Sequence, residues 1–195
     1  MNKFIVLLLA FFLTTVSQAQ KIADPELKSR LDTYMRLTHE LRFEELMDYT
    51  HPSIFGLMPR EQLVSAMREA FDNERMSMTI DSARATTVSP DFVVKNIHYK
   101  KVDYTMLVQV HFKDTSLFDK PDFVPTISAA FQKSFEGGTV TFDPVSHNFF
   151  IRASSLMMAI KDSPAKPWLF LGYQKDSTLI HRLYPQEVIT HFKLL

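Results

Sequence analysis

Apolar side chains recur every three or four residues in several parts of the chain, which is the spacing of an amphipathic helix. The first such stretch begins at Asp24–Pro25, where a capping carboxylate and a proline with fixed geometry suit a helix start. It is expected to continue to about Tyr49, with a small offset near Leu41. Pro52 disfavours helical geometry at His51, so this helix should end just before that residue.

Further helices are predicted downstream of Pro52. One runs from Pro59 to about Asn73, and another covers residues 123–138, where Gly137–Gly138 would close it. At the C-terminus, Asp176 and Pro185 are expected to start short helices. The expected buried side of the second helix is Leu63, Ala66, Met67, Ala70 and Phe71.

Strict alternation of apolar and polar residues predicts strands between the second helix and the C-terminal tail. The clearest stretch is 102–112, in which the even-numbered residues from Val102 to Phe112 face one side while Asp103, Gln109 and His111 face the other. Additional strands are expected over 76–81, 91–100, 147–160 and 167–173.

The order of these elements indicates an α+β domain. Its mainly antiparallel sheet of five or six strands would be curved around the N-terminal helices, with an inserted helix near 123–136. No low-complexity linker divides the chain, so residues 20–195 are interpreted as one domain. Cysteine is absent, which excludes disulfides and thiolate chemistry, and 46% apolar residues are enough for a packed core.

Residues 1–19 have the pattern of a cleavable export signal. Lys3 precedes the apolar run Phe4–Leu13, and small residues at Ser17 and Ala19 suit cleavage before Gln20. The apolar run is shorter than the roughly 20 residues that span a bilayer, and no cysteine follows it to carry a lipid. The expectation is a periplasmic or secreted protein without a membrane anchor after cleavage.

Charge and motif content remove several functional classes. The formal net charge is zero, so nucleic acid is not an expected partner. The histidines lack metal-ligand spacing, and neither a P-loop nor a dinucleotide fingerprint occurs, so no metal and no cofactor is expected. The seven histidines are His39, His51, His98, His111, His147, His181 and His191.

Three stretches carry a family resemblance. They are "YMRLTHELRFEELMDYTHPSIFGLMPREQLVSAMREAF", "KPWLFLGY" and "LYPQEV". Together they resemble the NTF2-like (SnoaL-like, cystatin-like cone) superfamily, in particular its exported Bacteroidetes-type members. The chain departs from the family pattern at "LRFEEL", which lacks the usual Gly-Asp, and residues 123–138 look like an insertion.

The resemblance implies a cone-shaped domain with an apolar pocket between a bent sheet and a long helix. Family members include isomerases, dehydratases, cyclases and non-catalytic binding modules, so the fold does not choose among them. Isomerase-like members carry a proton-shuttling carboxylate in the stretch equivalent to Thr50–Pro59, where this chain has neither Asp nor Glu. That absence speaks against isomerase chemistry.

No catalytic residue is assigned from the sequence. His51, Tyr34 and Asp103 are the candidates for acid–base work, and Tyr34, His51, Tyr104 and Trp168 are the candidates for ligand contact. Each has a structural alternative. His51 could satisfy free carbonyls at the helix end, Tyr34 and Trp168 could be core residues, and the histidines could simply be scattered over the surface.

Three functions therefore remain open. The favoured interpretation is a non-catalytic domain that binds a small apolar ligand or a protein partner. The second is an enzyme of the SnoaL or dehydratase type, which requires the candidate residues to converge in one cavity. The third is a homodimeric module that pairs through the sheet face carrying Gln109 and His111, which would have to be apolar enough to associate.

Overall fold

The computed structural model describes residue 22 and residues 24–135, 138–173 and 177–195. The expected export signal and the expected helix cap Asp176 lie outside these ranges. Within them, no helix is both long and apolar enough to cross a membrane.

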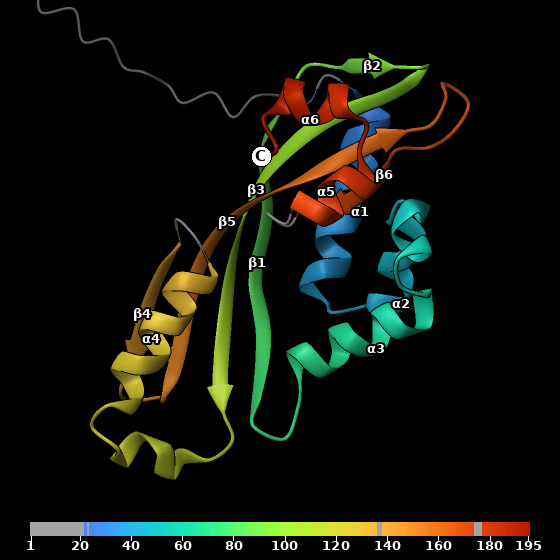
Figure 1. Cartoon of the computed structure of the whole chain (residues 1–195). Coiled ribbons are helices and arrows are strands. Elements are labelled where there is room, and N and C mark those ends of the chain that lie inside the picture. The colour runs from blue at the N-terminus through green and yellow to red at the C-terminus, as the bar shows by residue number, and fades with distance from the viewer. Residues whose placement is uncertain (1–21, 23, 136–137, 174–176) are drawn as a thin grey trace, which may run out of the picture.

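The chain forms an α+β structure around one curved, unclosed antiparallel sheet of six strands (Figure 1). The strand order is β1-β3-β5-β4; β2 also pairs with β3, and β6 also pairs with β5. The strands are β1 (Met76–Val88), β2 (Phe92–Val94), β3 (Ile97–Phe112), β4 (Thr139–Asp143), β5 (Asn148–Lys161) and β6 (Leu169–Gly172).

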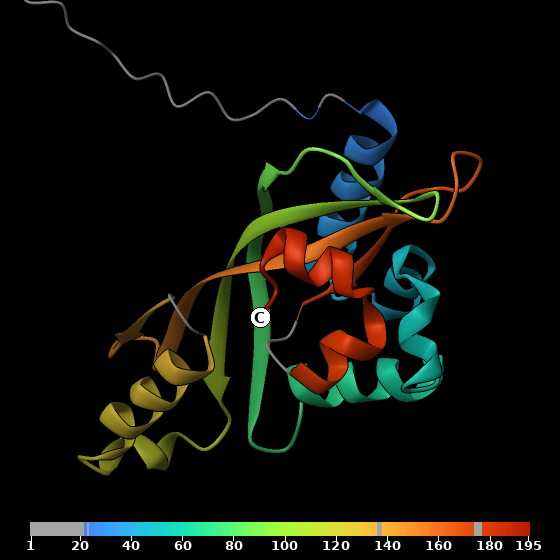
Figure 2. The same ribbon diagram turned by 45° about the horizontal axis from the view of Figure 1, so that its top comes forward.

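The pairing of β3 with β5 is the central feature of the sheet. It runs without a register shift from His98 opposite Lys161 to His111 opposite Asn148. Both strands bend strongly along their length (Figures 1 and 2). On the other side of β3, β1 follows this curvature with register shifts at Asp81 and Thr86, where an extra residue increases the local twist.

Helices cover different parts of the sheet. α1 packs beside β1 on one face, α5 and α6 pack on the other face, and α4 lies at the opposite end of the sheet from α5 and α6 (Figure 2). The helices are α1 (Pro25–His39), α2 (Phe43–Leu46), α3 (Arg60–Phe71), α4 (Phe123–Ser134), α5 (Ser177–Leu183) and α6 (Gln186–Phe192). Short 3-10 turns are η1 (Met47–Tyr49), η2 (Pro52–Gly56) and η3 (Thr115–Asp119).

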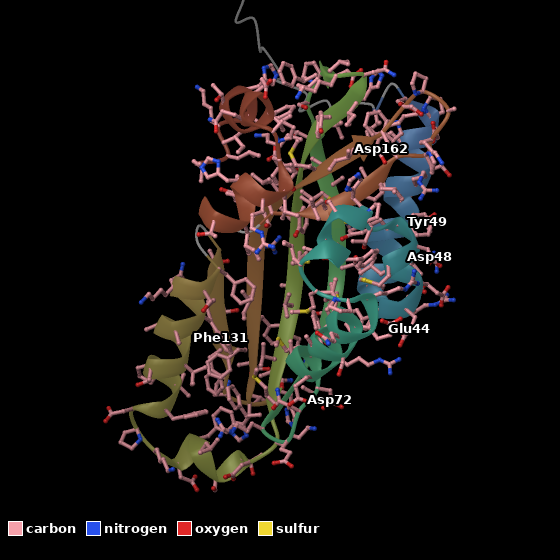
Figure 3. The ribbon with its side chains drawn as sticks, turned by 45° about the vertical axis from the view of Figure 1, so that its right-hand side comes forward. Glu44, Asp48, Tyr49, Asp72, Phe131 and Asp162 are labelled. Carbon is pink, nitrogen blue, oxygen red and sulfur yellow. The ribbon has the colours of Figure 1, made fainter. Side chains whose placement is uncertain are left out.

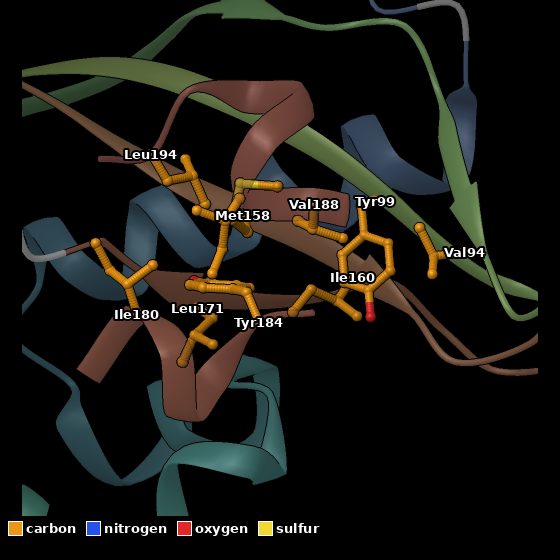
Figure 4. Close-up of a cluster of buried hydrophobic side chains, with 10 residues drawn as sticks. Val94, Tyr99, Met158, Ile160, Leu171, Ile180, Tyr184, Val188 and Leu194 are labelled. Atoms are coloured by element: carbon orange, nitrogen blue, oxygen red, sulfur yellow. The ribbon is translucent and has the colours of Figure 1, made fainter. Parts of the chain in front are cut away.

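The core lies on both faces of β5. Met157 and Ala159 pack with Leu27 and Leu31 of α1. The alternate residues Met158 and Ile160 pack on the other face against α5 and α6 (Figure 4). Because both faces are covered at this point, the strand contains a continuous apolar run instead of alternating with polar residues.

α4 packs over a cluster of aromatic rings at the far end of the sheet. The ring of Phe131, labelled in Figure 3, lies 5.6 Å from that of Phe149, and Phe123 lies 5.1 Å from Phe112. Such tilted aromatic pairs add to the free energy gained by burying the rings. None of the residues of α4 is fully buried, so this helix covers the cluster only in part.

The predicted start of the first helix and the end of helical geometry at Tyr49 are confirmed, but the segment is not one helix. α1 ends at His39, Leu41 has a φ of 54°, and α2 then starts at Phe43, so the offset expected near Leu41 is a true break. The break redirects the chain so that Phe43 and Leu46 pack beside Val64 of α3.

The burial predicted for α3 is wrong in detail. Val64 is its one buried residue, while Ala66 and Ala70 are exposed, because α3 packs at the edge of the cluster that contains Leu37 and Phe43.

Two strand predictions also need correction. The expected strand 91–100 is interrupted by a two-residue turn at Lys95–Asn96, whose φ angles of 50° and 67° are those of a type I′ hairpin. Its second half therefore belongs to β3. β4 is an additional strand, because no element is predicted over residues 139–143. The helix predicted before it is also shorter than expected, since α4 ends at Ser134 and not at Gly138.

Asp24 joins the start of α1 to the sheet. One carboxylate oxygen accepts the Leu27 N–H at 3.0 Å, and the other accepts the indole N–H of Trp168 at 2.9 Å. Glu26 and Lys161 form an ion pair at 2.7 Å nearby. Partial burial by itself would raise the pKa of Asp24, but these hydrogen bonds and the charge of Lys161 hold that pKa below its usual value.

Replacing Asp24 with alanine should therefore destabilise the protein at neutral pH. We expect a loss of about 2 kcal/mol in the free energy of unfolding, from a lost helix cap and an unpaired buried indole N–H. Folding lowers the pKa of Asp24. The stabilisation is therefore fully present at pH values above the pKa of Asp24 in the unfolded chain, and it is lost as the pH falls through the pKa of Asp24 in the folded protein. Urea unfolding at pH 7 and pH 3 measures it; a difference that did not narrow at pH 3 would contradict the assignment.

Tyr184 is a buried polar residue of the opposite kind, because its hydroxyl has no hydrogen-bond partner among the described residues. The residue is 4% exposed and lies beside Leu171 and Met158 (Figure 4). Burial raises the pKa of this hydroxyl, and the nearby tyrosines 34, 99 and 173 add to the increase.

Replacing Tyr184 with phenylalanine should stabilise the protein. The change removes a desolvated polar group and keeps the ring, so we expect a gain of about 1 kcal/mol in the free energy of unfolding. Tyr173→Phe is the matched control, because its hydroxyl donates to the Leu194 carbonyl at 2.6 Å and its removal should destabilise. Chemical unfolding of both variants compares them; destabilisation of the Tyr184 variant would show that the hydroxyl has a partner.

Candidate functional site

The outer edge of β5 is interrupted in its middle. β4 pairs with residues 148–152, and β6 pairs with residues 157–160. The Tyr173 N–H also donates to the Leu156 carbonyl at 3.3 Å, which continues the β6 pairing by one residue. Among the described residues, none pairs with Ser154 on this side. We call the opening between β4 and β6 the notch.

The backbone of Ser154 points into the notch. In an antiparallel ladder the N–H and C=O groups of one residue point to the same neighbouring strand, and successive residues alternate. Since the Leu156 carbonyl points toward β6, the polar groups of Ser154 point to the same edge. Three residues lie between the flanking pairs, so the opening is about 13 Å long at the usual rise of a strand.

A pocket of about 770 Å³ with a mixed lining contains the notch and extends across β3 to Thr86 of β1, and we include it under the same name. Apolar and aromatic walls alternate with hydroxyls, and Asp103 and Lys133 carry opposite charges at its margin. The apolar and aromatic members are Tyr104, Met106, Phe135, Ala153, Leu156 and Tyr173, and the hydroxyl members are Thr86, Thr105, Ser134, Ser154 and Ser155.

Asp103 and Tyr104 are the sequence candidates that line the notch. The Asp103 carboxylate accepts the Thr87 hydroxyl at 2.5 Å and lies 3.4 Å from the ammonium of Lys101. Both of its oxygens therefore have partners already, which suits a structural role better than proton transfer. Tyr104 packs against the core under α1.

Tyr34 lies elsewhere, on α1, where its ring packs at 4.9 Å from that of Phe170. Burial raises the pKa of its hydroxyl, and the neighbouring Tyr104 raises it further. The hydroxyl is thus protonated at neutral pH and cannot serve there as a base. This position agrees with the core role that the apolar face of the first helix suggested.

The suggested role of His51 at free carbonyls is wrong, because its ring contacts no carbonyl. Nδ1 accepts the Ser53 N–H at 3.4 Å and lies 2.9 Å from the Ser53 hydroxyl, so the residue caps η2, the turn that follows it. Nε2 lies 3.2 Å from the carboxylate of Asp162, which Figure 3 labels. Because the backbone N–H of Ser53 can only donate, Nδ1 is the acceptor and the proton of neutral His51 is on Nε2.

Ser53, His51 and Asp162 are connected in the same order as the nucleophile, the base and the carboxylate of a catalytic triad. Their geometry is nevertheless that of a helix cap. The same lone pair of Nδ1 faces both the N–H and the hydroxyl of Ser53. The backbone of His51 is also fixed, since its N–H donates to the Phe170 carbonyl at 2.8 Å. His51 thus joins η2 to β6 and to the residue that follows β5.

Trp168 is a core residue, as one of its interpretations held. It is buried, donates to Asp24, and has the ammonium groups of Lys100 and Lys161 each 5.8 Å from its ring. Tyr34, Tyr104 and Trp168 pack in one apolar cluster under α1, whereas His51 lies at η2 and Asp103 lines the notch. The candidates therefore do not all converge in one cavity.

The residues that sequence reasoning missed are those that make the notch. Ser154 and Ser155 interrupt an otherwise apolar strand, and this "ASS" segment was the available signal. Phe135 and Tyr173 could not be placed, because each is the first residue of a different connection, one after α4 and the other after β6. Within the described ranges, no group of three acidic or histidine side chains could hold a metal ion.

The sheet face proposed for dimerisation carries polar and apolar side chains together. His111 hydrogen-bonds Asn148 at 3.0 Å, Arg152 is exposed, and Phe150 is half-buried among them. Dimerisation through this face stays a prediction.

In comparisons with known proteins, no family model, no curated protein and no solved structure matches the chain.

Replacing His51 with alanine should lower stability by about 1 kcal/mol, the usual net value of one hydrogen bond. His181→Ala is the matched control, because His181 is exposed on α5 and should change stability by less than about 0.5 kcal/mol. Thermal unfolding of the two variants makes the comparison. An unchanged melting temperature in the His51 variant would overturn the capping role.

Proposed function

We propose that the chain is a non-catalytic binding module of the NTF2-like class that takes up a small, mainly apolar ligand in the notch. The observation that carries the proposal is the interrupted edge of β5. It combines apolar and hydroxyl-bearing side chains with the backbone donor and acceptor of Ser154, which have no partner among the described residues. Apolar walls with a few fixed polar groups are the usual composition of ligand sites.

The size of the notch supports a small molecule. About 770 Å³ lies within the range of roughly 300–1,000 Å³ that ligand pockets occupy. The opening offers the two backbone groups of a single residue, which is too few to hold a whole strand. The ligand class that fits is an amphipathic molecule with an apolar body and one hydrogen-bonding end.

The proposal of binding without catalysis is supported by the placement of the candidate groups. Asp103 is engaged by Thr87 and Lys101, and His51 is engaged by Ser53 and Asp162. The NTF2-like assignment itself is supported by the α+β order and by the curved sheet with α1 packed against it. The signal-like residues 1–19 support a periplasmic or secreted site of action.

Filling the notch should abolish binding. In Ser154→Tyr a ring occupies the opening, so we expect at least a tenfold loss of affinity for a dansylated undecanoic acid probe, measured by fluorescence titration. Thr141→Tyr is the matched control, because Thr141 is an exposed hydroxyl residue on the edge strand β4, outside the notch, and its variant should bind as the wild type does. Absence of binding to the wild type, or equal binding by Ser154→Tyr, would refute the proposal.

A further inference from the structure

The second opening of the sheet is a groove between α1 and the outer edge of β1. It has a volume of about 860 Å³. α1 contributes one side of it, including Leu31, Met35 and His39, and β1 contributes residues 81–85. Within the part of the chain that the structure describes, no strand pairs with this edge of β1. We call this opening the edge groove.

The direction of each backbone group at this edge follows from the sheet register. The polar groups of Ala153 and Ser155 point toward β3, so their partners Met106 and Tyr104 point toward β5. The intervening Thr105 then points toward β1, where it pairs with Arg84. The N–H and C=O groups of the flanking residues Ala83 and Ala85 therefore point outward, into the edge groove.

Independent contacts agree with this alternation. The Asp103 carbonyl, which should point toward β1, accepts the Thr86 hydroxyl at 3.0 Å. The Ile80 carbonyl, which should point outward, contacts Nδ1 of His39 on α1. α1 thus satisfies one outward carbonyl, while the described residues provide no partner for the outward backbone groups of Ala83 and Ala85.

The two register shifts of β1 set the length of this free edge. They lie at Asp81 and Thr86, so residues 82–85 form a regular segment of four residues between them. Bulges at both ends block the extended edge-to-edge pairing that leads to aggregation. A short segment that pairs only with Ala83 and Ala85 is still compatible with this geometry.

We propose that the edge groove binds an extended segment of a partner polypeptide, which adds to the sheet beside β1 as a short strand. Donor and acceptor groups repeating every second residue match the backbone of a strand. The residues of the segment opposite Ala83 and Ala85 face α1, where the buried Leu31 and Met35 form the apolar part of the groove and the ion-paired Lys28, Asp32 and Arg36 are exposed. Apolar side chains suit these two positions because the charges of α1 are already paired. The residue between them lies opposite Arg84.

The charge of Arg84 determines which residue type suits the middle position of the bound segment. Arg84 is exposed, and among the described residues it has no ion pair, whereas Lys28 and Arg36 on α1 are paired with Asp32 and Glu40. An acidic residue directly opposite Arg84 would complete a cross-strand pair. The recognised pattern is therefore apolar, acidic, apolar in an extended segment.

A second copy of this chain fits the edge groove less well. In the two-fold arrangement that pairs Ala83 with Ala85 of the other copy, the two Arg84 side chains lie directly opposite each other. Like charges in that position destabilise a strand pair. The inference is independent of the notch, because the two openings share no lining residue.

The first test uses two capped synthetic peptides, GTVEVTG and GTVKVTG, titrated into ¹⁵N-labelled protein. The acidic peptide should shift the amide signals of Ala83 and Ala85 and bind about fivefold more tightly than the basic one. In Arg84→Glu this preference should reverse. The proposal would be overturned if both peptides bound equally, if only other residues shifted, or if neither peptide bound. Amide shifts that depend on protein concentration without peptide would also contradict it, because they would indicate that a second copy occupies the groove.

The second test uses a matched pair of prolines. Ala85→Pro removes an outward N–H, so the fold should be kept while the acidic peptide loses at least fivefold in affinity. Arg84→Pro removes an N–H that points to β3, so the protein should be destabilised without peptide present. Full peptide affinity in a folded Ala85→Pro variant would contradict the backbone pairing.

Discussion

The uninterrupted pairing of β3 with β5 determines most of this structure. Two strands of 16 and 14 residues keep one register over nearly their whole length, and the right-handed twist of such a ribbon accumulates into a strong bend. None of the neighbouring strands is long enough to follow the ribbon from end to end on its own. β1 follows the bend only with two bulges, and the other edge is shared by β4 and β6.

Both open places of the sheet are consequences of that mismatch. On one edge, β4 and β6 end before they meet and leave Ser154 between them. On the other, the bulges of β1 isolate Ala83 and Ala85 beside α1. Each opening places backbone donors and acceptors beside apolar side chains.

The residues that looked chemically most capable serve the joints between elements. Trp168 and Asp24 hold the start of α1 on the sheet, and His51 connects η2 to β6 and to Asp162. His51 has a side chain that is 13% exposed, whereas that of Asp162 is 48% exposed, so this contact lies at the surface. The hydrogen-bonding groups of the Trp168 and His51 rings all have partners in neighbouring residues, which is typical of a structural role.

The sequence by itself determined the features that depend on local periodicity and on single residues. The α+β class, the start of α1 at Asp24–Pro25, the strand nature of 102–112 and the run Met157–Ile160 follow from apolar spacing and from capping and turn chemistry. The break at Leu41 and the turn at Lys95–Asn96 require positive φ angles, which asparagine favours but which leucine and lysine do not indicate. Only the tertiary structure decided which residues meet. The notch joins Asp103 to Phe135 and Tyr173, and the edge groove joins α1 to Ala83 and Ala85. Such contacts depend on the register and bend of the whole sheet, and the pattern within any single segment does not contain them.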